Sequence, residues 1–121
     1  MKGININCRK KDWIGLILTG EKTIETRDSM SLHPYIGQRI GLVATGRGKA
    51  TLHGYATIKK VVEYRSLEDW NKDMSKHLVM YTDPYCWEVG NTKLKWGYVL
   101  TDVERCEPRI IETKGIVARE I

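Results

Sequence analysis

The segment Gly20-Glu21-Lys22-Thr23-Ile24-Glu25-Thr26-Arg27 lies in the first quarter of the chain and organises the rest of it. It follows an apolar run, residues 13–18, whose large side chains recur at i+3 and i+4, as on one face of a helix. Gly20 can end that helix because glycine adopts a positive φ without a steric penalty. Beyond it the period changes to two, so the segment predicts a junction from helix to strand.

The period of two also predicts where the polar side chains of this segment point. Thr23, Glu25 and Arg27 fall on one face of the strand, and Ile24 and Thr26 fall on the other. Lys22 stands at the junction itself. In the functional interpretation, Lys22 and Glu25 are catalytic candidates that share acid–base work, and Arg27 binds phosphate or carboxylate through its planar fork. The alternative is a solvated strand face whose Glu25–Arg27 pair contributes little to stability.

Length and charge set broad limits on the protein. We expect a single domain over residues 1–121, which is enough chain for a hydrophobic core. The 20 Lys and Arg residues exceed the 15 Asp and Glu residues, which gives a net charge of +5 and a pI near 9.2. This balance favours an anionic partner such as nucleic acid or a nucleotide, although many basic proteins bind nothing acidic. The ligand we expect is RNA, a nucleotide or a nucleoside. We expect the protein to act as a monomer.

The cysteines and the apolar pattern bear on the compartment. No run of 18 apolar residues exists, so we expect no membrane association, and residues 1–7 lack the apolar core of a signal peptide. Cys8, Cys86 and Cys106 are an odd number without close pairing, which is typical of free thiols in a reducing cytoplasm.

Neither a metal site nor a serine nucleophile is indicated. The histidines and cysteines show no metal-ligand spacing, so we expect no metal and no cofactor. No serine lies in a nucleophile-elbow sequence.

The remaining pattern predicts an α+β fold. Alternating or β-branched runs predict a series of strands, at 3–8, 39–45, 52–64, 85–89, 95–103 and 116–121. Gly54 is a possible bulge, and Pro108 is expected to end the segment after the fifth of these strands. Helices are predicted from Asp12, as N-cap, to residue 19 and over 66–78. This order favours a small mixed or antiparallel β-barrel with two or three short helices at its edge.

A basic, glycine-rich loop follows the strand at 39–45. Thr45 ends that strand, and Gly46-Arg47-Gly48-Lys49 places two cations in four residues. The spacing of a phosphate-binding P-loop is missing. The loop could hold a phosphate beside a pocket, and a plain hairpin turn is the alternative.

The motif Trp13-Ile14-x-Leu16-Ile17-x-x-Gly20-x-Lys22-Thr23-Ile24-Glu25-x-Arg27 resembles the opening motif of ASCH domains, which are PUA-like β-barrels. Further segments fit the same family in the same order, at 35–40, 43–46, 96–103 and 114–115. The resemblance covers essentially the whole chain.

The resemblance implies a cleft beside the Gly-x-Lys-Thr-Ile-Glu-x-Arg core. We expect the ligand-binding residues there to be Trp13, Thr23, Arg27, Thr45, Arg47 and Lys49. Members of the family bind RNA, cleave single-stranded RNA, or act as amidohydrolases that deacylate modified cytidine. The function expected here is binding of RNA or a modified nucleotide, and the alternative is a metal-independent hydrolase.

The amidohydrolase branch of the family uses a lysine, a threonine three residues later and a downstream glutamate. Lys22 matches the lysine, whereas Glu25 occupies the threonine position. The downstream glutamate has three candidates, Glu63, Glu68 and Glu88. A lysine desolvated in such a cleft can have a lowered pKa and act as a base or nucleophile, whereas a neighbouring Glu25 would keep it charged.

Overall fold

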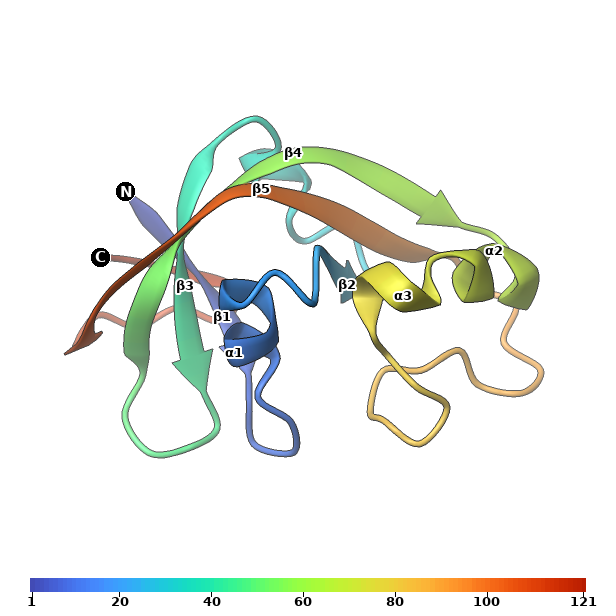
Figure 1. The fold of residues 1–121 in the computed structure, drawn as a ribbon, viewed down its shortest axis with the longest axis horizontal. Coiled ribbons are helices and arrows are strands. Elements are labelled where there is room, and N and C mark those ends of the chain that lie inside the picture. The colour runs from blue at the N-terminus through green and yellow to red at the C-terminus, as the bar shows by residue number, and fades with distance from the viewer.

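The computed structural model describes all 121 residues, which form six strands, three short α-helices and one 3₁₀ turn at 33–35 (Figure 1). In chain order the elements are β1 (Lys2–Asn7), α1 (Trp13–Leu18), β2 (Ile24–Arg27), β3 (Arg39–Thr45), β4 (Thr51–Tyr64), α2 (Leu67–Lys72), α3 (Met74–His77), β5 (Lys95–Ile110) and β6 (Ala118–Glu120). The amino and carboxyl ends lie close together on the left of Figure 1, where β6 pairs with β1. No helix is long and apolar enough to cross a membrane.

All six strands belong to one mixed sheet. Their order is β2-β5-β4-β3-β1-β6, and only the β1–β3 pair is parallel. The α+β class, the mixed sheet and the short helices are therefore confirmed. The sheet is not closed into a barrel, because no ladder joins its two edge strands, and these are short, with four residues in β2 and three in β6.

The helix-to-strand junction is formed as predicted. Asp12 caps α1 by accepting a hydrogen bond from the amide of Gly15, and Gly20 has φ +83° just beyond the helix. The amide of Lys22 donates to the carbonyl of Leu16, which folds the chain back before β2 begins at Ile24. The junction therefore places Lys22 and β2 beside the end of α1.

The two longest strands, β4 and β5, form an arch over the other elements (Figure 1). Their register shifts in three places, one of them at the predicted bulge between Leu52 and Gly54. The prediction that Pro108 ends a segment is wrong, because β5 runs through it. Pro108 lies in the extra residues of that bulge, between Arg105 and Arg109, where no ladder amide is required.

Two other expectations about the elements need correction. The predicted helix over 66–78 is split at Asp73, which ends α2 and precedes α3, and whose carboxylate accepts a hydrogen bond from the Tyr64 hydroxyl at 2.7 Å. The predicted strand at 85–89 does not form. Pro84 precedes Tyr85, whose φ of +69° is incompatible with an extended strand.

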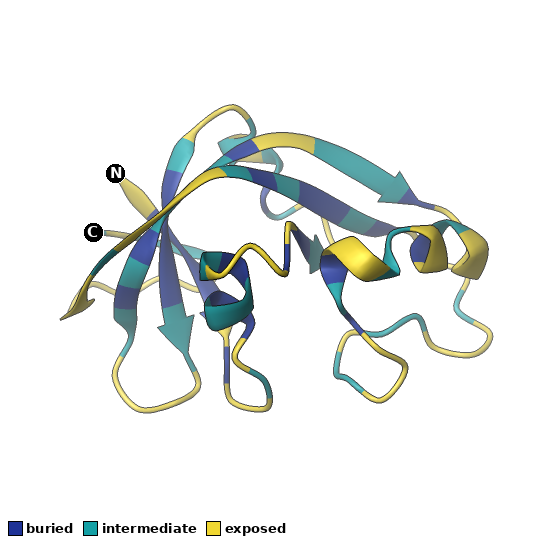
Figure 2. Cartoon of the chain, viewed as in Figure 1, coloured by how far each residue is buried: buried dark blue, intermediate teal, exposed yellow.

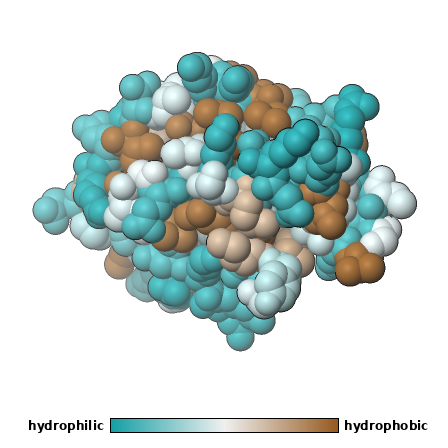
Figure 3. All heavy atoms as spheres, turned by 45° about the vertical axis from the view of Figure 1, so that its right-hand side comes forward, coloured by the Kyte–Doolittle hydropathy of each residue, from teal (hydrophilic) through white to brown (hydrophobic).

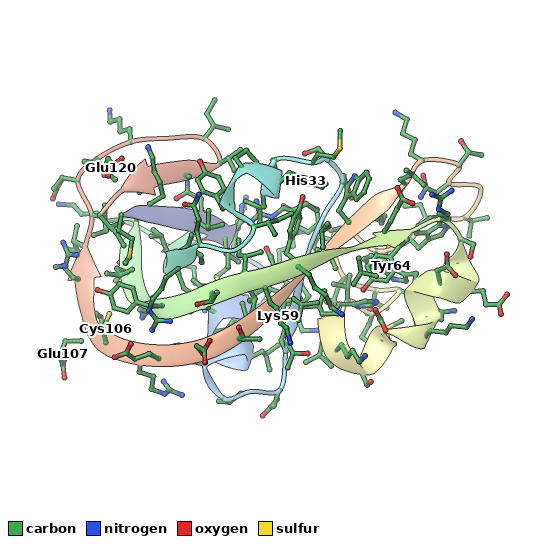
Figure 4. The ribbon with its side chains drawn as sticks, turned by 90° about the horizontal axis from the view of Figure 1, so that it is seen from above. His33, Lys59, Tyr64, Cys106, Glu107 and Glu120 are labelled. Atoms are coloured by element: carbon green, nitrogen blue, oxygen red, sulfur yellow. The ribbon has the colours of Figure 1, made fainter.

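The core lies between the inner face of the sheet and the helices. Figure 2 shows buried positions along the middle of the strands and on α1, with exposed loops at the lower edge. Tyr64 and Trp70 pack edge to face at 5.3 Å between ring centroids, where β4 ends beside α2. Figure 4 shows Tyr64 at this end of β4, opposite the end of the sheet that carries Cys106 and Glu107. All three cysteines are free thiols.

Candidate functional site

The cavity around Lys22 has a volume of about 430 Å³ and gathers side chains from both ends of the chain. Of the predicted site residues, it is lined by Trp13, Lys22, Glu25, Arg27 and Thr45. The remaining lining residues are Asn5, Ile6, Asn7, Thr26, Asp28, Ser29, Ser31, Val79, Tyr85, Ile116 and Val117. We call this space the Lys22 cavity.

Lys22 is almost completely buried, with 1% of its surface exposed. Its Nζ donates a hydrogen bond to the carbonyl of His77 at 2.6 Å and lies 3.8 Å from Oε1 of Glu25. Burial lowers the pKa of Lys22 from its ordinary value, because it penalises the charged ammonium, and the nearby Glu25 carboxylate opposes that shift. Lys22 is therefore a desolvated cation held between a carbonyl and a carboxylate.

Glu25 connects Lys22 to Arg27. Its Oε2 accepts a hydrogen bond from the Arg27 guanidinium at 3.0 Å, and its side chain is 10% exposed. The same guanidinium nitrogen donates to the carbonyl of Asn5 at 2.8 Å. Nε of Arg27 is buried and has no hydrogen-bond partner. The two cations share one carboxylate, so the triad carries one net positive charge and an unused donor.

Trp13 forms part of the cavity wall and contacts two ammonium groups. Nζ of Lys22 and Nζ of Lys11 each lie 4.7 Å from the Trp13 ring. Lys11 also donates to the Asp83 carboxylate at 2.8 Å. These contacts are cation–π interactions, which fix the indole in place and stabilise the buried positive charge.

Asn5 holds the opposite wall together. Its side-chain amide donates to the carbonyls of Gly115 and Ile116, at 2.8 and 3.1 Å, and its Oδ1 accepts from Nε of Arg119 at 2.8 Å. The segment before β6, which contributes Ile116 and Val117 to the cavity, is thereby fixed against β1.

Three predicted binding residues lie outside the cavity. Thr23 has an exposed side chain and precedes β2, so the alternation of the strand does not extend to it. The prediction that Thr26 faces away from the site is also wrong, because Thr26 lines the cavity. Arg47 and Lys49 are exposed in the loop between β3 and β4. They follow Thr45, which lines the cavity, but neither of them lines it.

Several lining residues were not predicted from the sequence. Asn5 could have been noticed as a polar side chain in the middle of a strand whose central residues, 3–6, are all buried. Asp28, Ser29 and Ser31 follow β2 directly, but loop residues give no periodic signal. The pattern at 85–89 predicts a strand and gives Tyr85 no place in a cavity. The three downstream glutamates considered for an amidohydrolase site, Glu63, Glu68 and Glu88, do not line the Lys22 cavity.

His77 accepts the hydrogen bond from Lys22 through its backbone carbonyl. We expect its buried imidazole to make the stability of the fold sensitive to acid. The imidazole is fully buried, its Nδ1 accepts from the amide of Val79, and its Nε2 lies 2.9 Å from the carbonyl of Trp70. The neutral ring with its proton on Nε2 satisfies both contacts. Burial lowers the pKa of His77 below its ordinary value because it penalises the imidazolium.

The unfolded chain therefore takes up a proton near pH 6.5 while the folded chain does not. The free energy of unfolding should fall as the pH drops below 6.5, by up to about 1.4 kcal/mol per pH unit until the folded pKa is reached. Urea unfolding at pH 7.5, 6.5 and 5.5 measures this slope. We expect the slope to be weaker in His77→Gln and retained in His53→Gln, a change at a half-buried histidine of β4. An unchanged slope in His77→Gln would contradict the assignment.

Comparison with known proteins agrees with this fold. Crystal structures of the ASCH protein from Zymomonas mobilis superpose on the chain. The structure of a point mutant gives a TM-score of 0.72 at 21% identity, and the superposition covers 90% of this chain and 72% of that chain. A second structure of that protein gives 0.68 at 20% identity, over 92% and 73%. No curated protein sequence matches the chain.

Identities this low support the shared fold alone. The sequence itself carries the family assignment, because the model of the ASCH domain matches residues 9–107, which include α1, Lys22, β2 and most of β5. β1 and the segment before β6, which contributes Ile116 and Val117 to the Lys22 cavity, lie outside that match. The chain belongs to the ASCH domain family.

Proposed function

We propose that this ASCH domain binds single-stranded RNA or a modified nucleotide in the Lys22 cavity. The observation that carries the proposal is the triad of Lys22, Glu25 and Arg27, because two cations share one carboxylate inside a concave site and leave a buried guanidinium donor unpaired. Such a site is complementary to one negative charge or to the acceptors of a base edge. The volume of about 430 Å³ suits a ligand of nucleotide size.

The rim of the cavity supports a ligand that carries phosphate. A Cβ at Gly46 would lie 2.4 Å from Oδ1 of Asn7 and 3.0 Å from Cβ of Arg9, so the β3–β4 loop lies directly against the β1–α1 loop. The two loops bring four exposed cations to this edge of the molecule, Arg9, Lys10, Arg47 and Lys49. We call this set the basic rim. A polynucleotide whose base enters the cavity could place its neighbouring phosphates on the basic rim.

The basic rim gives a prediction about salt. The double variant Arg47→Ala with Lys49→Ala should bind single-stranded RNA more weakly at low salt, because cations that neutralise phosphates release condensed counterions on binding. The plot of log K against log salt should also become shallower, by about 0.7 for each phosphate that the variant no longer neutralises. Fluorescence anisotropy with a labelled oligonucleotide at several salt concentrations measures both effects.

The matched control removes the same charge elsewhere. Lys59 and Lys60 are exposed on β4, and neither lines the Lys22 cavity (Lys59 is labelled in Figure 4). The double variant Lys59→Ala with Lys60→Ala should keep the wild-type slope. Equal losses of RNA affinity in the two double variants would mean that the net charge of the protein alone drives binding. No binding by the wild type, even at low salt, would exclude RNA and leave a nucleotide or nucleoside as the ligand.

A metal-independent hydrolase is the second candidate, and the pKa of Lys22 favours it. A lysine whose pKa is lowered by burial, with a carboxylate at 3.8 Å, can exchange a proton with a bound substrate. Glu25 replaces the threonine of the amidohydrolase pattern, and no candidate downstream glutamate lines the cavity, so cleavage of RNA fits better than deacylation of cytidine. Incubation with labelled single-stranded RNA and with acylated cytidine, in the presence of a chelator, tests both reactions.

A further inference from the structure

A second cavity adjoins the Lys22 cavity. Its volume is about 370 Å³, and its lining residues are Asp28, Tyr85, Cys86, Glu88, Asn91, Lys93, Leu94 and Lys95. Asp28 and Tyr85 also line the Lys22 cavity, so these two residues form a partition between the two spaces. The segment 78–94, which builds most of the second cavity, lies on the right of Figure 1. Figure 3 turns that side forward and shows hydrophobic side chains exposed between hydrophilic ones.

A buried ammonium group fixes this partition. Lys95 is 7% exposed, and its Nζ donates to Oδ1 of Asp28 at 2.5 Å and to the carbonyl of Tyr85 at 3.2 Å. The same Nζ lies 5.6 Å from the Trp70 ring. One desolvated cation at the start of β5 therefore holds both residues of the partition, and it neutralises the Asp28 carboxylate.

Tyr85 has the features of an unused aromatic surface. It is 55% exposed, its hydroxyl makes no hydrogen bond within the protein, and its ring takes part in none of the aromatic pairs of the fold. Its φ of +69° is a conformation that glycine or asparagine adopts easily and that strains a bulky residue. Strain of this kind persists where the surrounding structure enforces it, and it is concentrated at functional sites.

The charges of the second cavity favour a base over a phosphate. Asp28 is neutralised by Lys95, and the remaining charged groups are the Glu88 carboxylate and the Lys93 ammonium, which offset one another. The side chain of Asn91 contacts the backbone of Lys93 through two hydrogen bonds at 3.0 Å, which orders this wall. A neutral, flat group with donors and acceptors on its edge fits such a space better than an anion does.

We propose that the second cavity is a subsite for the base of the nucleotide next to the one in the Lys22 cavity, with the Tyr85 ring stacked against it. This inference rests on the proposed function and makes it more specific, because the ligand is then single-stranded RNA of at least two nucleotides. Stacking of a base on an aromatic side chain tolerates any sequence, since every base has a flat face.

The test uses a substitution that relaxes the backbone while it removes the ring. In Tyr85→Gly the melting temperature should stay constant or rise, because glycine adopts φ +69° without strain. The affinity for hexauridylate should nevertheless fall about 5- to 150-fold, the range expected for the loss of one stacked base. The affinity for uridine monophosphate should fall by a clearly smaller factor, because Tyr85 lines the Lys22 cavity but a single nucleotide places no base in the second cavity. Tyr85→Phe should bind hexauridylate like the wild type, because it keeps the ring.

A matched control lies in the same segment. Tyr81 is 88% exposed and lines neither cavity, so Tyr81→Ala should leave the affinity for hexauridylate unchanged. The wild type should also bind the dinucleotide UpU at least about fivefold more tightly than uridine monophosphate, by the same stacking contribution.

The outcomes separate this inference from the proposed function. If the wild type binds uridine monophosphate and hexauridylate equally and Tyr85→Gly changes neither, the second subsite is wrong while the Lys22 cavity remains a nucleotide site. If Tyr85→Gly weakens both ligands by the same factor, Tyr85 belongs to the Lys22 cavity alone, which also overturns the subsite. If the wild type binds neither ligand, the proposed function fails, and this inference fails with it.

Discussion

Replacing Lys22 with methionine is expected to remove nucleotide or RNA binding while the protein still folds. The ligand would lose the only ammonium group inside the Lys22 cavity, and removing one partner from a buried charged contact costs about 2–5 kcal/mol of binding free energy. Methionine fills a similar volume. Glu25 keeps its hydrogen bond to Arg27, so the main cost to folding is the unpaired carbonyl of His77, about 1–3 kcal/mol.

The pH dependence of stability gives Lys22→Met a second readout. In the wild type the pKa of Lys22 lies below its ordinary 10.5, so the full penalty for burying the ammonium is present below the folded pKa. As the pH rises from the folded pKa toward 10.5, the folded state releases its proton first, and the penalty is relieved. Over this alkaline range, the free energy of unfolding of the wild type should therefore rise relative to that of Lys22→Met. Urea unfolding at several pH values measures this difference.

A control and a contradicting result complete this test. Lys59→Met removes an exposed lysine of β4. It should alter neither ligand binding nor the dependence of the free energy of unfolding on alkaline pH. The hydrolase alternative is checked with the same protein samples, since cleavage of RNA that depends on Lys22 must disappear in Lys22→Met. Full ligand affinity in Lys22→Met would remove the proposed site, and RNA cleavage that persists would have to come from elsewhere.

The substitution Glu25→Gln is expected to cause the largest loss of stability in the site. Glu25 is the one carboxylate between the Lys22 ammonium and the Arg27 guanidinium, and it is 8% exposed. Its removal leaves two cations with no anion between them, and breaking a buried ion pair in this way costs about 3–5 kcal/mol. The pKa of Lys22 should fall further, because the Glu25 carboxylate is the main group that opposes its lowering.

The loss should therefore shrink as the pH rises. As the pH rises toward the lowered pKa of Lys22 in the variant, a growing fraction of the amine loses its proton and no longer repels Arg27, so the destabilisation measured at pH 9 should be smaller than that measured at pH 7. Urea unfolding at both pH values gives the two numbers. The control Glu68→Gln removes a carboxylate from an exposed pair with Lys72, and it should change stability by less than about 0.5 kcal/mol.

Ligand binding by Glu25→Gln decides what the carboxylate does. If the folded fraction binds RNA as the wild type does, Glu25 only stabilises the fold. If binding is lost while stability is unchanged, Glu25 contacts the ligand and its ion pairs do not stabilise the fold. We expect lower stability together with altered affinity, because the same oxygens hold Arg27 and line the Lys22 cavity.

The sequence alone was sufficient for the elements that depend on local pattern. The Asp12 cap, the positive φ of Gly20 and the start of β2 each follow from residues within a few positions of one another. The bounds of β3 are those predicted, since a β-branched apolar run with a glycine loop after it leaves few alternatives. The family resemblance rested on the same local motif, and the match over residues 9–107 confirms it.

Predictions from local pattern were wrong where a contact with another segment of the chain decides the backbone conformation. The helix at 66–78 is interrupted because the Asp73 carboxylate binds Tyr64, and the strand at 85–89 is absent because Lys95 holds the carbonyl of Tyr85 in a turn. β5 continues beyond Pro108 because β4 pairs with both sides of the bulge. In each case the deciding contact comes from a different segment of the chain.

The surroundings of the candidate site depended on the tertiary structure most of all. The sequence placed Glu25 and Arg27 on one face of β2, since a strand repeats every two residues, and it placed Lys22 at the junction before that strand. Lys22 is buried against a segment 55 residues away, where its ammonium donates to the carbonyl of His77. Arg27 is anchored by a hydrogen bond to the carbonyl of Asn5, 22 residues away. Periodicity describes only the neighbours along the chain, whereas desolvation and hydrogen bonding depend on which distant segments the fold brings together.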